Sequence, residues 1–332
     1  MNRELGKIYV TGSDGFIGSH LVEELLTRGH QVTALCIYNS NGHYGWLEKY
    51  AIDCPKNLSL ILGDVRDPFF LESTIKGHDT VFHLASLIAI PYSYQAPQSY
   101  FETNSIGAIN IAQACQKNDV GRLIHTSTSE VYGTAEFVPI TEKHPIQGQS
   151  PYSASKISAD MVIESYFKSF DLPAVTLRPF NTYGPRQSLR AVIPTVIGQM
   201  LAGSNEIKLG SLTPTRDFNY VDDTVAAFIA VGETINENVL GKVFNAGSER
   251  EISIGDLVAM VARLLKKEVK ISSEDERIRP VNSEVERLLA DSTRLKELTS
   301  WKPETDLEQG LTNVISWLKD SDFIKRSIHY HR

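Results

Sequence analysis

Two short stretches of the sequence carry side chains that could move protons. In "HTSTSEVYG", four hydroxyl residues, Thr126 to Ser129, run directly into a carboxylate, Glu130. In "YSASK", Tyr152 and Lys156 are four positions apart, so on a helix both side chains lie on one face. A lysine ammonium close to a phenol favours the phenolate and lowers the pKa of the tyrosine. We therefore predict that Tyr152 accepts a proton from a hydroxyl group near neutral pH.

Both stretches also have structural interpretations. A carboxylate at the end of a strand can cap the turn that follows, and this is the alternative for Glu130. The pattern Tyr-x-x-x-Lys occurs by chance on many surface helices. Its position favours chemistry here, because the helix that begins near Pro151 follows the strand that ends in "STSEVYG".

A glycine-rich loop near the N-terminus predicts a dinucleotide site. Gly12, Gly15 and Gly18 form G-x-x-G-x-x-G between an apolar strand at residues 8–11 and a helical pattern that ends at Gly29. Glycines let the backbone approach a pyrophosphate closely, and a helix N-terminus favours the negative charge. Glycine spacing alone is a weak signal, but here a complete strand–turn–helix–strand unit surrounds it.

The residues expected to hold the rest of the dinucleotide are less regular. In "GDVRD", Asp64 could accept a hydrogen bond from an adenine amino group with Val65 beside the ring, or it could cap the next helix. The acid that usually ends the second strand and binds the ribose is missing, because that position falls at or near Cys36. Asn39 and Ser40 could hydrogen-bond either cofactor. The sequence favours NAD and leaves NADP open.

Apolar strand-like runs alternate with helical patterns through most of the chain. This order predicts an α/β fold with a Rossmann-type doubly wound parallel sheet. After Pro179 the pattern becomes rich in turns, and helices are expected at residues 254–266 and 307–319. We predict a dinucleotide-binding domain at residues 1–178 plus roughly 217–248. A smaller mixed C-terminal lobe, at residues 179–216 and 249–325, would bind the substrate.

Composition excludes several classes of function. The chain has 332 residues and a net charge of −7, without the basic stripe of a nucleic-acid binder. Its longest apolar run, residues 80–90, is too short to cross a membrane. The glycine loop begins so early that we expect no signal peptide. Three cysteines and nine histidines form no metal-ligand pattern, which favours a reducing, cytoplasmic location and no metal.

Four motifs together resemble a known family. "TGSDGFIGSH", "HTSTSEVYG", "YSASK" and "RPFNTYGPRQ" are similar, in kind and in order, to motifs of the extended short-chain dehydrogenase/reductases that act on nucleotide sugars. The resemblance covers nearly the whole chain. Within that family, "HLASLIAIPYSYQAP", "YNSNGHYGWLE" and "IRPVNSEVERL" look closest to the 4,6-dehydratases of the legionaminic-acid type.

The resemblance implies a reaction and roles for five residues. Thr128 would hydrogen-bond the sugar 4-hydroxyl, and Tyr152, aided by Lys156, would take its proton while C4 gives hydride to the nicotinamide. The resulting ketone acidifies C5, and Glu130 would remove the C5 proton before water leaves from C6. Return of the hydride to C6 gives a 4-keto-6-deoxy sugar. Ser129 stands where the glucose-type dehydratases have an acid that protonates the leaving hydroxyl.

That departure leaves more than one reaction open. The triplet Thr128, Ser129 and Glu130 resembles both the GDP-mannose dehydratases and the UDP-glucuronate decarboxylases. Simple 4-epimerases usually lack the glutamate. A dinucleotide sensor without activity would need none of the four residues Thr128, Glu130, Tyr152 and Lys156. We predict a nucleotide-sugar 4,6-dehydratase with NAD, acting on GDP- or UDP-N-acetylglucosamine.

The resemblance also implies binding residues and a homodimer. Arginine guanidinium groups suit diphosphate oxygens, although a single arginine is more often a surface charge. Helices near residues 99–116 and 152–167 resemble the pair that forms a four-helix dimer interface, or they simply pack on the sheet. The predicted substrate site contains Ser86, Tyr92, Thr128, Asn181, Arg186, Arg216 and Arg279. The predicted cofactor site contains Gly12, Gly15, Phe16, Ile17, Gly18, Asn39, Ser40, Asp64, Val65, Leu84, Ala85, Ser86, Asn104, Tyr152 and Lys156.

Overall fold

A seven-stranded parallel sheet forms the centre of the larger lobe. The computed structural model describes residues 2–204, 206–273 and 283–321. The strands lie in the order β10-β6-β5-β4-β1-β2-β3, and every pair is parallel. Their bounds are β1 Lys7–Thr11, β2 Gln31–Ile37, β3 Leu58–Gly63, β4 Thr80–His83, β5 Arg122–Thr126, β6 Ala174–Pro179 and β10 Val243–Ala246. The predicted Rossmann-type fold is therefore confirmed.

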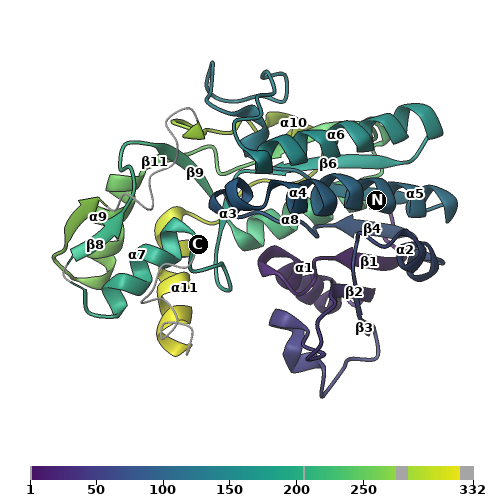
Figure 1. Ribbon diagram of the computed structural model, residues 1–332, viewed down its shortest axis with the longest axis horizontal. Helices are drawn as coiled ribbons and strands as arrows, with labels where there is room; N and C mark the ends of the chain where they lie inside the picture. Colours follow the sequence, from purple (N-terminus) through teal and green to yellow (C-terminus); the bar gives the residue numbers. More distant parts are fainter. Residues whose placement is uncertain (1, 205, 274–282, 322–332) are drawn as a thin grey trace.

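Helices cover both faces of this sheet because its strands are apolar on both sides. In β1, Ile8 and Val10 pack with helices α1 (Phe16–Thr27) and α8 (Val221–Glu233), whereas Tyr9 packs on the opposite face. That second face is covered by α2 Pro68–Ile75, α5 Gly107–Lys117 and α6 Pro151–Phe170. Figure 1 shows α5 and α6 running alongside the sheet.

Helix α6 begins at a well-defined cap. Ser150 accepts a hydrogen bond from the backbone of Ser153, and the Ser153 side chain accepts one from the backbone of Ser150. Pro151 occupies the first helical position, where its missing N–H is harmless. This capping box fixes the start of the helix, and so the register of Tyr152 and Lys156 in its first two turns.

The helix expected near residues 99–116 is interrupted. A short helix, α4 (Pro97–Tyr100), continues into a π-helical turn at Phe101–Ile106, and only then into α5. A π turn widens the helix locally, and such turns are frequent at functional sites. Here it contains Asn104, whose side chain hydrogen-bonds both the N–H and the C=O of Leu87.

The smaller lobe is built from discontinuous pieces around two small sheets, and it lies at the left of Figure 1. Strand β9 pairs parallel with β7 and antiparallel with β11, and β8 pairs parallel with β12. The predicted helices at residues 254–266 and 307–319 are confirmed within one residue as α9 and α11. The bounds of these elements are β7 Asn181–Tyr183, α7 Val192–Leu201, β8 Glu206–Leu209, β9 Thr215–Tyr220, β11 Glu251–Ser253, α9 Ile254–Leu265, β12 Lys270–Ser273, α10 Thr293–Leu298 and α11 Leu307–Asp320.

The proposed boundary near residue 217 falls inside β9 of the three-stranded sheet. Fully buried Asp217 anchors this strand by accepting hydrogen bonds from the backbone of Ser248, Glu249 and Ala290. Strand β9 leads directly into α8 of the larger lobe, so the chain passes between the lobes without an intervening loop. The domain division remains a proposal.

Within residues 2–204, 206–273 and 283–321, none of the helices combines the length and the apolar character that a bilayer requires.

Candidate active site

The glycine loop leaves room that side chains would fill. Gly12 adopts a φ of +68°, and a Cβ placed there would lie 2.7 Å from the backbone nitrogen of Ala85. A Cβ on Gly18 would lie 2.1 Å from the carbonyl oxygen of Gly12. Gly15 caps the N-terminus of α1. The loop and the helix N-terminus therefore form a backbone cradle that fits a pyrophosphate.

Neighbouring strands meet at this cradle. Thr11, the last residue of β1, accepts hydrogen bonds through Oγ1 from the backbone nitrogens of Leu84 and Ala85, at 3.1 and 3.0 Å. These two residues directly follow β4. Strands β1 and β4 are neighbours at the point where the strand order of the sheet changes direction, and the predicted cofactor residues lie near this point. Ligands bind in α/β sheets at this kind of switch point. Phe16 and Ile17 begin α1 beside it.

The loop after β2 begins next to the expected ribose position. Cys36 is completely buried inside β2, one residue before the strand ends at Ile37. Tyr38 and Asn39 are the first residues beyond the strand. The Asn39 amide donates to the carbonyl oxygens of Ile37 and His43 and accepts from the His43 N–H, while Ser40 is exposed in the turn. Hydrogen bonds from Asn39 and Ser40 to the cofactor remain predictions.

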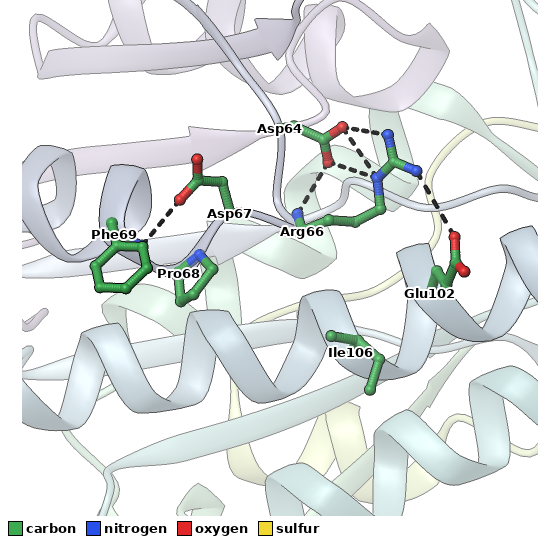
Figure 2. A pocket seen from close by; sticks show the side chains of 7 residues that line it. All are labelled: Asp64, Arg66, Asp67, Pro68, Phe69, Glu102 and Ile106. Atoms are coloured by element: carbon green, nitrogen blue, oxygen red, sulfur yellow. Dashed lines mark hydrogen bonds and ion pairs between the residues drawn. The ribbon is translucent and has the colours of Figure 1, made fainter.

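Asp64 lies in an open pocket of about 560 Å³ that Figure 2 shows. Arg66 donates to both of its carboxylate oxygens, at 2.6 to 3.0 Å, and is 3.8 Å from Glu102. The hydrogen bonds from Arg66 lower the pKa of Asp64. Asp67, rather than Asp64, caps α2, so the capping alternative for Asp64 is wrong. A contact between Asp64 and adenine remains a prediction, and Arg66 would share it.

The strand end that carries the predicted acid turns sharply. Thr128 caps a short 3₁₀ helix, Ser129–Tyr132, by accepting a hydrogen bond at 3.2 Å from the backbone nitrogen of Glu130. Ser129 is buried, whereas the Glu130 side chain is only partly buried. The turn thus places Glu130 beside Thr128 rather than in the core.

Tyr152 and Lys156 meet this strand end from α6. Tyr152 is buried and hydrogen-bonded to Thr128. Burial raises the pKa of Tyr152 well above its usual value, the Thr128 hydrogen bond opposes this, and the charge of Glu130 adds to it. Lys156 donates to the carbonyl oxygen of Thr126 at 2.5 Å. The expectation that the lysine lowers the tyrosine pKa is therefore wrong for this structure, because burial outweighs every opposing interaction.

Sequence reasoning missed an aromatic wall next to Tyr152. The ring of Tyr100 lies edge-on to Tyr152, with centroids 6.2 Å apart, and Tyr92 lies 6.2 Å beyond it. Tyr92 belongs to the short helix α3, Ile90–Gln95, and is 38% exposed, so it can face a ligand as predicted. Ser86 is half-buried nearby in the chain, and its hydroxyl contacts the carbonyl oxygen of Leu84 at 3.5 Å.

The four residues predicted to hold the substrate have different surroundings. Asn181 carries a buried side-chain oxygen, Oδ1, without a hydrogen-bond partner among the described residues, which suits a ligand donor. Arg216 is 6% exposed and donates to Glu284. Arg186 donates to Ser19 and Glu23 of α1, so its guanidinium joins the two lobes instead of lying free for phosphate. Arg279 lies outside the described residues.

Beneath the site lies a buried polar cluster that the sequence did not reveal. Asp160, one turn after Lys156 on α6, accepts hydrogen bonds from Ser127 and Arg178. His83 and His125 lie beside it in β4 and β5, with ring centroids 5.5 Å apart. The only available signals were the four-residue spacing of Lys156 and Asp160 and the arginine of "RPFN".

Comparison with known proteins identifies the family. The family model described as GDP-mannose 4,6 dehydratase matches residues 9–314. The chain belongs to this family. Its members belong to the extended short-chain dehydrogenase/reductases, so that part of the resemblance is confirmed, while the legionaminic-type assignment remains a prediction.

Individual relatives show how varied this family is. The UDP-N-acetyl-alpha-D-glucosaminuronate decarboxylase of Bacillus cytotoxicus is 33% identical over 94% of this chain and 97% of its own length. A dTDP-glucose 4,6-dehydratase of Mycobacterium tuberculosis is 30% identical over 95% of this chain and 94% of its own. The crystal structure of UDP-glucuronic acid 4-epimerase from Bacillus cereus, with UDP-glucuronic acid and NAD, superposes with a TM-score of 0.86 at 29% identity. That superposition covers 94% of this chain and 99% of the epimerase.

Together these relatives settle the class of chemistry and not the reaction. Their names describe a decarboxylase, a 4,6-dehydratase and a 4-epimerase of nucleotide sugars. The NAD prediction is confirmed at the level of the family, since the solved epimerase holds NAD.

The cradle can be tested by filling it. We expect Gly18→Ala to purify without dinucleotide, because its Cβ would lie 2.1 Å from the Gly12 carbonyl oxygen. The bound dinucleotide is released by denaturation and quantified by chromatography. Gly255→Ala is the matched control, since its Cβ would meet nothing closer than 3.7 Å. Full dinucleotide content in Gly18→Ala would contradict this account of the loop.

Proposed function

We propose that this protein is an NAD-dependent nucleotide-sugar 4,6-dehydratase acting on GDP- or UDP-N-acetylglucosamine. The observation that carries the proposal is the meeting of Thr128, Glu130 and Tyr152 at the carboxyl end of β5, next to the glycine cradle. This combination offers a hydroxyl ligand, a carboxylate base and a phenol base around one sugar ring.

The first step would be oxidation at C4. Thr128 accepts or donates a hydrogen bond at the 4-hydroxyl, and Tyr152 takes its proton. A buried phenol is a strong base once ionised, and the hydrogen bond with Thr128 is the interaction that favours the ionised form of Tyr152. Bound NAD supplies the hydride acceptor for C4 and, at the end of the cycle, the hydride donor for C6.

Glu130 would act in the second step. A ketone at C4 acidifies the proton on C5, and a carboxylate held beside the ring removes it. The C6 hydroxyl then leaves as water by taking the proton that Glu130 removed from C5, and once C6 has been reduced C5 receives the proton that Tyr152 took from the 4-hydroxyl. Partial burial of Glu130 favours this role, because a base in a site shielded from water competes less with solvent.

The smaller lobe would hold the nucleotide. Arg216 is nearly buried at the start of β9, where a guanidinium can meet diphosphate oxygens if Glu284 shares it. The buried Asn181 Oδ1 can accept from a sugar hydroxyl. Arg279 is proposed from the resemblance alone. Arg186 is the weakest of the predicted ligands, because Glu23 and Ser19 already engage it.

A UDP-glucuronate-type decarboxylase is the second candidate. Ser129 is the observation that favours it, because no carboxylic acid adjoins Glu130 in the triplet to protonate a leaving hydroxyl. Loss of carbon dioxide needs no such acid. The 33% identical relative from Bacillus cytotoxicus carries a decarboxylase name. Glu130 opposes a simple 4-epimerase, and all four intact chemical residues oppose a sensor without activity.

The deciding experiment is mass spectrometry of the products. The purified protein is incubated with UDP- and GDP-N-acetylglucosamine, dTDP- and UDP-glucose, GDP-mannose and UDP-glucuronate. We expect one of the N-acetylglucosamine nucleotides to lose one water. Loss of carbon dioxide from the glucuronate would establish the decarboxylase instead, and an isomer of unchanged mass would establish an epimerase.

The role of Glu130 makes a separate prediction. Glu130→Gln should still oxidise C4 but stop before elimination, so reduced cofactor should accumulate on the enzyme. The near-ultraviolet absorbance of the reduced nicotinamide measures this. Tyr152→Phe is the matched control, which should keep NAD bound and give no reduced cofactor. If folded, substrate-binding Glu130→Gln gives none either, Glu130 has a role other than removal of the C5 proton.

We also propose that the protein forms a homodimer through α6 and the π-helical turn. These neighbouring elements expose large apolar side chains, which a second copy would cover. Their exposed fractions are 41% for Phe101, 46% for Ile106, 45% for Met161 and 55% for Phe170. The cytoplasmic location predicted from the cysteines agrees with three free thiols and stays a prediction.

The dimer is tested by placing a charge on that face. Met161→Asp should convert the protein to a monomer in light scattering, because a carboxylate would be buried unpaired in the interface. Ile52→Asp, at a residue that is 96% exposed elsewhere, should leave the mass unchanged. A wild-type monomer, or a dimeric Met161→Asp, would contradict the proposed interface.

A further inference from the structure

The buried cluster below the active site centres on one carboxylate oxygen. Asp160 Oδ2 accepts hydrogen bonds from Ser127 Oγ at 2.8 Å and from Arg178 Nε and Nη2 at 3.1 and 2.8 Å. Asp160 and Arg178 are each about 2% exposed in their side chains. On its other side, Asp160 Oδ1 lies 3.4 Å from His125 Nε2 without hydrogen-bond geometry.

Burying an ion pair so completely is costly. The desolvation penalty of two buried charges often equals or exceeds their attraction, and an apolar pair would serve packing equally well. The cluster is nevertheless continued: Arg178 donates to the Tyr132 hydroxyl, which donates to Asn245. A costly arrangement of this kind calls for a role other than stability alone.

Two adjacent residues at the end of β5 connect the cluster to the reacting groups. Ser127 immediately precedes Thr128, and its hydroxyl is held by Asp160. The carbonyl of Thr126, one residue earlier, receives the ammonium of Lys156. Asp160 and Lys156 are themselves one helical turn apart on α6. One carboxylate therefore joins the helix that carries Tyr152 to the strand end that carries Thr128.

Asp160 is the group that stabilises the positive charge of Lys156. Burial lowers the pKa of Lys156 to about 8, and Asp160 opposes that change. His83 from β4 and His125 from β5 also interact electrostatically with Lys156, and Arg178 from β6 is paired with the same Asp160. Burial lowers the pKa of both histidines. An imidazole is either neutral or positively charged, so neither ring can act as a counter-charge for the Lys156 ammonium.

We propose that Asp160 is a positioning residue of the active site. Through Ser127 it fixes the strand end that presents Thr128, and through its negative charge it keeps Lys156 protonated in a buried position. The inference rests on the proposed oxidation at C4. It holds whichever group leaves the sugar afterwards.

The test is the pH profile of C4 oxidation in Asp160→Asn holoenzyme. Asparagine keeps the shape and one acceptor oxygen but removes the charge. Formation of reduced cofactor is followed on mixing with the accepted nucleotide sugar. The negative charge raises the pKa of both Lys156 and Tyr152, so its loss moves the whole profile to lower pH. We expect the alkaline limb to shift by about one unit.

Ser127→Ala is the matched control that keeps the charge. It should lower kcat about tenfold, as expected for loss of one buried hydrogen bond to a carboxylate, with little change in KM and no shift of the profile. A structural defect alone would lower the rate of Asp160→Asn equally at every pH. An unshifted profile in Asp160→Asn, or unchanged kcat in Ser127→Ala, would overturn the proposal.

Two further measures keep the test decisive. If Asp160→Asn fails to fold because Arg178 is left unpaired, Asp160→Asn/Arg178→Gln removes both charges and undergoes the same profile. If no sugar is oxidised by wild type, the proposed function fails, and the inference is judged on crystal structures of the variants. We expect Lys156 Nζ to leave the Thr126 carbonyl in Asp160→Asn, and Thr128 to move in Ser127→Ala. If Lys156 and Thr128 keep their wild-type positions in these two variant structures, the proposal is refuted.

Discussion

The buried ion pair between Asp160 and Arg178 constrains the larger lobe more than any apolar contact does. An apolar helix can slide on an apolar sheet at small cost, but a carboxylate on α6 must meet the guanidinium on β6, or both charges remain unpaired in the interior. Only one register of α6 satisfies this condition. That register places Tyr152 against Thr128 and Lys156 against the end of β5.

The order of the sheet supplies the second half of the site. Because β1 and β4 are neighbours at the switch point, the glycine cradle after β1 lies next to Ala85 after β4, and β5 follows on the same side. Thr11 joins the first two ends through its hydroxyl. A dinucleotide on the cradle would therefore extend toward Tyr152 without any movement of the sheet.

Contacts between the lobes lie beside the cofactor region. Glu23 of α1 binds Lys49 on one oxygen and Arg186 on the other, at 2.8 and 2.7 Å. Trp46 lies in a short 3₁₀ helix, Gly45–Tyr50, and its backbone nitrogen donates to the carbonyl oxygen of Asp14 in the glycine turn. Its ring lies edge-on to Trp317 of α11, with centroids 5.7 Å apart. The smaller lobe thus contacts the segment after β2 as well as the substrate side.

Local patterns were sufficient to predict the sheet and the strand–turn–helix unit that holds the glycine cradle. Glycine spacing and apolar alternation each span about a dozen residues, so they can be recognised in a single sequence. Contacts between segments that are distant in the sequence could not be predicted in this way. Nothing near Arg186 indicated Glu23, and nothing in "HTSTS" indicated that Ser127 would meet Asp160. The π turn was not predicted, and its residue Asn104 hydrogen-bonds Leu87, which lies on another segment.

The predicted direction of the pKa shift of Tyr152 was wrong for a similar reason. The spacing of Tyr152 and Lys156 is local, but the burial that raises the phenol pKa comes from the surrounding fold. The end of the second strand, by contrast, was predicted closely, since β2 ends at Ile37, one residue after Cys36.

The central claim is that one hydrogen of the sugar travels from C4 to C6 within a single active site. It is tested most directly with nucleotide sugar deuterated at C4 and nuclear magnetic resonance of the product. The account predicts that the product is a 4-keto-6-deoxy sugar with deuterium in its C6 methyl group. Deuterium found back at C4, or a product that has lost its C6 carbon, would contradict the account.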